Sequence, residues 1–182
     1  MATTHEEAVL AAQTAVRDLN GTYYGLTATV NRLNQQILAK GEVAHLATIV
    51  GHEANAKVAH KELAALRAER AVAKSGLDYL KSVALPDAHS KAMGAEVDEM
   101  IDRSARWSAT AKEERAKLLE GFAATGDAGA GAEIDLSKTN SQKLADEARS
   151  LFLSAADLKA RLVEDVEKRE EVKRAYRARQ ME

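Results

Sequence analysis

The fold of this chain is decided near its start, by residues 9–37, which read VLAAQTAVRDLNGTYYGLTATVNRLNQQI. Val, Tyr or Ile recurs at every seventh position, and Ala or Leu stands three residues after each of the first four. This spacing is a heptad, whose a and d positions face another helix. The a and d residues are Val9, Ala12, Val16, Leu19, Tyr23, Leu26, Val30, Leu33 and Ile37. The pattern predicts one long helix, from about residue 5 to residue 39, that packs along this face.

Two local signals bear on the extent of this helix. Lys40 and Gly41 form a stop signal, a basic last turn followed by a residue that tolerates left-handed dihedrals. Asn20-Gly21 is a hairpin signal, and Thr22–Val30 is rich in β-branched and aromatic residues, so a strand is the competing prediction there. The helix is favoured because the heptad crosses this stretch without a change of phase.

The same helix is predicted to have neighbours on two faces. Residues 19–31 contain no charged side chain, whereas the flanks of a simple two-stranded coiled coil usually carry Glu and Lys. Gly21 and Gly25 stand one turn apart, opposite the heptad positions, and would let another backbone approach closely. The other small residues of that stripe are Ala11, Thr14 and Ala28. We therefore assign close packing to the two glycines.

Two further helices are predicted before residue 123. The second runs over Glu42–Leu85 and ends at Pro86, because the residue before a proline is biased away from helical dihedrals. It opens on a wide apolar face of Val43, Leu46, Ile49 and Val50. Its alanine-rich heptad is Ala56, Ala59, Leu63, Leu66, Ala73, Leu77, Leu80 and Ala84, interrupted by Arg70. Gly51 is either a kink or a turn. The third helix covers about residues 88–122.

A glycine- and alanine-rich stretch separates these helices from the last one. Residues 123–136 are predicted to be a flexible linker or loop, which divides a helical domain of residues 1–122 from a C-terminal amphipathic coiled-coil helix in residues 137–182. The heptad leucines of this helix are Leu144, Leu151, Leu158 and Leu162. Asp165 and Arg169 then interrupt the pattern. They form either a polar layer or the point where the helix leaves its partner, and the charged surroundings favour the second interpretation.

Composition excludes several classes of function. The 182 residues include no cysteine, so thiol catalysis, disulfides and thiolate metal sites are excluded. A formal net charge of −2 argues against general affinity for polyanions. No run of 18 apolar residues exists that would span a membrane, and the acidic start resembles no secretory signal, so we expect a cytoplasmic protein.

No group of residues predicts catalysis, a cofactor or a metal. Glu42 and His45 have the spacing of a di-iron ligand pair, but no second copy of that motif exists. His45, His52 and His60 are too far apart to bind one metal together, although a pH-sensitive interface is an alternative.

An acidic cluster on the third predicted helix is interpreted as a solvated helix face. It consists of Glu96, Asp98, Glu99 and Asp102, and it lacks the glycine and loop spacing of a calcium site. The neighbouring Arg103 and Arg106 would neutralise it.

Taken together, the sequence predicts an all-α protein, a long antiparallel helical hairpin and coiled-coil bundle of about four helices. Its expected function is that of a structural or scaffolding protein, whose partners are copies of itself or subunits of a larger assembly. Whether the helices pair with those partners in parallel or antiparallel stays open. The alternative is an accessory nucleic-acid-binding protein that contacts phosphates through the basic C-terminal residues Lys173, Arg174, Arg177 and Arg179.

Overall fold

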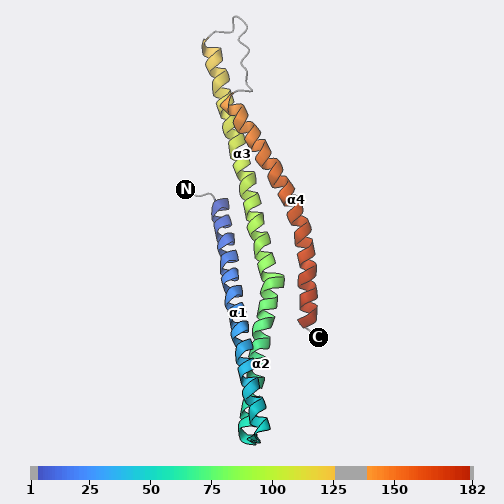
Figure 1. Cartoon of the computed structure of the whole chain (residues 1–182). Coiled ribbons are helices and arrows are strands. Elements are labelled where there is room, and N and C mark those ends of the chain that lie inside the picture. Colours follow the sequence, from blue (N-terminus) through green and yellow to red (C-terminus); the bar gives the residue numbers. More distant parts are fainter. Residues whose placement is uncertain (1–3, 126–138, 181–182) are drawn as a thin grey trace. The chain divides into compact units, whose positions relative to one another are not determined.

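The computed structural model of the protein describes residues 4–125 and 139–180, and these residues are helical almost throughout (Figure 1). The elements are α1 (Thr4–Ile49), α2 (Glu53–Tyr79), a π-helical segment η1 (Leu80–Ala84), α3 (Leu85–Thr125) and α4 (Asn140–Gln180). Within the described residues there is no strand. The predicted all-α class is therefore confirmed. Because α2, η1 and α3 follow one another without a break, the described residues form three long helices where about four were predicted.

The chain divides into two compact units. Unit 1 combines the residues up to Gln13 with Ser90–Lys168, and unit 2 combines Thr14–His89 with the residues from Arg169 onward. α1, α3 and α4 each contribute to both units. Of the predicted linker, residues 123–125 belong to the end of α3, and residues 126–136 lie outside the described residues.

In unit 2, α1 and α2 run antiparallel beside each other (Figure 1). Lys40 Nζ lies 2.5 Å from Glu62 Oε2. Further from the turn, Arg70 Nη1 donates a hydrogen bond of 3.2 Å to Asn34 Oδ1. The residues of α1 thus meet those of α2 in reverse order. The heptads of both helices supply this contact, with Leu33, Ala44, Ala56, Ala59 and Leu63 buried.

The turn between α1 and α2 lies at Gly51, which resolves the ambiguity between a kink and a turn. Gly51 has a φ of +77°, a conformation that glycine adopts without a steric penalty. Its N–H donates to the Thr48 carbonyl (3.2 Å), and the His52 N–H donates to the Ala47 carbonyl (3.0 Å). This pair of bonds is the Schellman motif, which satisfies carbonyls at the end of a helix.

The predicted stop at Gly41 is wrong, since α1 continues to Ile49. Ala44, seven residues after Ile37, is buried, so the heptad contact extends past the glycine. Glycine in a helix interior costs about 1 kcal/mol relative to alanine, and the contacts of the additional turns offset that cost. The competing strand over Thr22–Val30 is also wrong, because these residues lie inside α1.

The predicted helix end at Pro86 is wrong as well. Proline normally breaks a helix because it lacks an N–H and its ring clashes with the carbonyl four residues earlier. Here η1 precedes it, and the Leu85 N–H donates to the Leu80 carbonyl, five residues back. The wider turn of a π-helix changes where the carbonyls point ahead of the proline ring. Leu85 accordingly keeps helical dihedrals, φ −64° and ψ −48°.

Unit 1 is built from α3, the first part of α4 and the start of α1. Gly94 of α3 faces Leu162 of α4, and a β-carbon on that glycine would lie 3.5 Å from Leu162 Cδ2. Ser104 Oγ donates to the Ala148 carbonyl at 2.7 Å, so α3 and α4 are antiparallel in this unit. Gln13 Nε2 donates to Glu96 Oε1 at 3.0 Å and holds α1 to α3.

Candidate interaction surfaces

The heptad residues of α1 lie on its least exposed side. Val16, Leu19, Tyr23, Leu26, Val30 and Ile37 are half-buried in unit 2, and Val9 is half-buried in unit 1. Leu33 is 0 % exposed. Leu26 faces Gly76 of α2, where an added β-carbon would lie 3.4 Å from Leu26 Cδ1. At Leu26, this face therefore packs within the chain, against α2, in unit 2.

Gly21 and Gly25 lie on an open part of α1. Both are exposed, and a β-carbon added to either would meet no atom within 4 Å. Tyr24, between them along the chain, is exposed too. The second neighbour predicted for this face is thus not supplied by the part of this chain that the structure describes.

An apolar open surface follows further along α1, and we call it the outer face. It consists of Leu38, Glu42, Val43, His45, Leu46, Ile49 and Val50, all exposed to solvent. A helix turns by about 100° per residue, which places this arc on the side of α1 opposite Ala44, the residue buried against α2. Val43, Leu46, Ile49 and Val50 were predicted as the opening face of the second helix. The sequence does contain an indication that these four residues face outward, because Ala44 and Ala47 occupy the next a and d positions of the α1 heptad.

The leucines predicted on the C-terminal helix lie in unit 1, against α3. Leu144, Leu151, Leu158 and Leu162 are half-buried, and Ala148 and Ala155 between them are buried. An open groove of about 340 Å³ runs beside this contact, lined by residues of both helices, among them Ser108, Arg149 and Phe152. The leucine pattern of α4 is thus occupied by a partner from the same chain.

The last turns of α4 stay in contact with unit 2, so the interpretation that the helix leaves its partner at Asp165 and Arg169 is wrong. Arg169 Nη1 donates to the Pro86 carbonyl. Lys173 Nζ lies 2.6 Å from Asp87 Oδ1, and the Tyr176 ring lies 5.6 Å from the ring of Tyr79. Polar side chains therefore continue the contact where the leucines end.

The predicted phosphate-contact residues divide into two kinds. Lys173 is held by two carboxylates, since Glu170 Oε1 also lies 2.9 Å from its ammonium. The hydrogen bond to Asp87, followed by that to Glu170, raises the pKa of Lys173, and Lys173 in turn lowers the pKa of Glu170. The exposed guanidinium groups are those of Arg174, Arg177 and Arg179.

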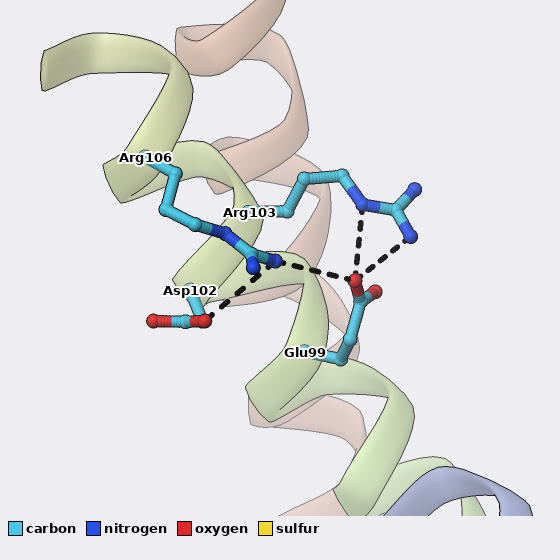
Figure 2. A network of polar contacts seen from close by, with 4 residues as sticks. All are labelled: Glu99, Asp102, Arg103 and Arg106. Carbon is cyan, nitrogen blue, oxygen red and sulfur yellow. Dashed lines mark hydrogen bonds and ion pairs between the residues drawn. The ribbon is translucent and has the colours of Figure 1, made fainter. Parts of the chain in front are cut away.

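Two members of the acidic cluster of α3, Glu99 and Asp102, are paired with arginines of the same helix, as Figure 2 shows. Glu99 Oε1 accepts hydrogen bonds from Arg103 Nε (3.0 Å) and Nη2 (2.8 Å) and lies 3.8 Å from Arg106 Nη2. Arg106 Nη2 also lies 3.7 Å from Asp102 Oδ2. The neutralisation expected from the sequence is present at Glu99 and Asp102, whereas Glu96 accepts a hydrogen bond from Gln13. The expectation of a solvated face fails at Glu99, which is 8 % exposed, so the arginines there compensate a buried charge.

The histidines singled out in the sequence lie apart on the surface. His45 is on α1, His52 precedes α2 and His60 is on α2, and all three are exposed. Among residues 4–125 and 139–180, no three His, Asp or Glu side chains are grouped so that they would hold a metal ion. The helices in these two ranges include none with the length and apolar character needed to cross a membrane.

Comparison of the chain with protein-family models, with curated proteins and with solved structures found no match.

Proposed function

We propose that the protein is a structural or scaffolding protein that acts by helix–helix association, of the coiled-coil kind, with copies of itself or with subunits of a larger assembly. The observation that carries the proposal is the outer face of α1, which presents large apolar side chains to solvent. Leu38, Val43, Leu46, Ile49 and Val50 are 52–69 % exposed. Contiguous apolar patches of this kind mark protein–protein contacts in soluble domains.

The composition of the buried core supports the proposal. Eight of the thirteen buried apolar residues among those described are alanines, and the others are Leu33, Leu63, Leu80, Val83 and Val97. Alanine allows helices to lie close together but buries little apolar area per residue. Many large apolar side chains of the described residues are exposed to solvent instead, among them those of the outer face. A partner that covers them would supply burial that the single chain lacks.

Light scattering of the purified full-length chain across a concentration series tests self-association. We expect a species larger than the monomer, whose share rises with concentration or is constant if the assembly is tight. A monomer at every concentration would refute self-association.

The second candidate function is nucleic-acid binding through the end of α4, and the exposed arginines favour it. Arg174, Arg177 and Arg179 lie within two turns of one helix. Because Lys173 is already paired with Asp87 and Glu170, the three arginines would carry the contact. Binding would then weaken steeply with salt and disappear when the three arginines are changed to glutamine, whereas Lys173→Gln would leave it nearly unchanged. Absence of binding to DNA and RNA at low salt would refute this function.

A further inference from the structure

On the outer face of α1, one row of residues has a pattern of apolar and polar side chains that is the same from either end. Leu38, Glu42, His45 and Ile49 follow at spacings of four, three and four residues, so they form one stripe along the helix. In either direction along the helix, the stripe consists of an apolar residue, two polar residues and a second apolar residue. A second copy of the helix laid antiparallel on this stripe would place Leu38 opposite Ile49 at both ends.

The two central residues are complementary to each other in that arrangement. Glu42 of one copy would lie opposite His45 of the partner subunit, and the two-fold symmetry would repeat the pair. Both the neutral and the protonated histidine side chain carry at least one N–H, and this N–H can donate a hydrogen bond to a carboxylate. Neither Glu42 nor His45 has an ion-pair or hydrogen-bond partner for its side chain in residues 4–125 and 139–180. Both groups are thus available to a second copy.

The amount of apolar surface is consistent with a weak specific dimer. The five large apolar side chains of the outer face, at 52–69 % exposed, present roughly 500 Å² per copy, within the range of the largest patches on monomeric proteins. Two copies would bury roughly 1,000 Å² of it, near the lower limit for a specific interface. We therefore expect a dissociation constant in the micromolar range. The opposite side of α1 is taken by α2, so the outer face is accessible without rearrangement of the helix pair.

We propose that the outer face of α1 docks on the same face of a second copy of this chain, antiparallel, with Glu42 of each copy opposite His45 of the partner subunit. The inference rests on the proposed function of self-association and adds to it the surface and the register. It identifies the partner by self-complementarity of the stripe.

A charge exchange tests the register. Sedimentation equilibrium of the full-length chain would compare the unchanged protein with Glu42→Lys, His45→Glu and the double variant that carries both. Glu42→Lys faces a lysine with a histidine, and His45→Glu faces two carboxylates with each other, so each is expected to weaken dimerisation about tenfold or more. The double variant restores opposite groups at both pairs and is expected to regain most of the affinity. Equal loss in the single and double variants would overturn the register.

A second measurement uses the absence of cysteine from the chain. Glu42→Cys and His45→Cys are prepared separately, mixed and oxidised. The proposed register brings the two thiols together only in the mixed dimer, so we expect a disulfide-linked dimer from the mixture and little from either variant alone. Equal cross-linking of each variant with itself would contradict the arrangement.

Ile49→Asp and Val72→Asp separate this inference from the proposed function. Both positions are exposed in the monomer, but Val72 lies on α2, outside the outer face. We expect Ile49→Asp to abolish the dimer and Val72→Asp to leave it, with equal helix content by circular dichroism. An oligomer that persists in Ile49→Asp would keep self-association and overturn the outer face as its surface. A monomeric unchanged protein would overturn this inference and the self-association on which it rests. Binding of that monomer to phospholipid vesicles, lost in Ile49→Asp, would assign the outer face to a lipid surface and would overturn the inference as well.

Discussion

Truncation of Leu33 to alanine is the sharpest test of the α1–α2 contact. The side chain is 0 % exposed and lies at a d position of α1. Leucine-to-alanine changes in cores cost about 2–5 kcal/mol, through lost burial and the cavity left behind. A narrow helix pair relaxes around a cavity more readily than a thick core, so we take about 3 kcal/mol. For a protein of this size that corresponds to a fall in Tm of roughly 6–12 °C.

Thermal melts followed by circular dichroism, at two protein concentrations, measure this effect and separate it from dissociation of an oligomer. The matched control is Val72→Ala, also in unit 2, where the valine is 75 % exposed. Its expected effect is within about 0.5 kcal/mol, as for other surface substitutions. If both variants melt within 2 °C or so of the unchanged protein, a margin below the roughly 2–4 °C that 1 kcal/mol produces, then Leu33 is not part of a cooperative core.

Three further predictions concern unit 2. Gly76→Ala is expected to stabilise it by about 0.5–1 kcal/mol, because the added β-carbon lies at an ordinary contact distance, 3.4 Å, from Leu26 Cδ1; a lower midpoint in chemical denaturation would contradict this. Leu26→Asp places a carboxylate in the same contact and is expected to abolish assembly and most helicity, measured by light scattering and circular dichroism. The Asp87 carboxylate raises the pKa of Lys173, so the stability from this pair is present below the pKa of an unfolded lysine, about 10.4, and is lost as the pH rises through the higher folded pKa. Asp87→Asn should reduce that alkaline loss in denaturation measured across pH, with the part due to Glu170 remaining, and an unchanged pH profile would argue against the pair.

The face of α1 that packs within the chain was predictable, because large apolar residues occupy its heptad positions. Val16, Leu19, Leu26 and Leu33 recur at heptad spacing, and the structure buries them at least partly. The outer face was not predictable as such, because large apolar residues in a sequence usually mark the buried side. In this chain Ala44 takes the contact, and leucine, isoleucine and valine lie on the opposite side.

The two wrong helix ends have the same physical origin. Gly41 and Pro86 are strong local signals, but each costs only a few kcal/mol, and contacts with other helices outweigh that cost. Next to Gly41, Lys40 of α1 forms an ion pair with Glu62 of α2. Near Pro86, the π-helical segment and the hydrogen bond from Arg169 stabilise the continuous helix. Neither partner is adjacent in sequence, so single-sequence signals had no access to them.

Ala111, Ala148 and Ala155 show what the alanine cores mean for sequence change over evolution. Each is nearly or fully inaccessible to solvent, so its methyl group is enclosed by packed neighbours. A larger side chain there must push two stiff helices apart, and the displacement spreads to the adjacent contact positions. Glycine, which removes the methyl group, requires no such displacement. In a leucine-filled core the damaging mutations are those that remove atoms; at these three positions the damaging mutations are those that add them.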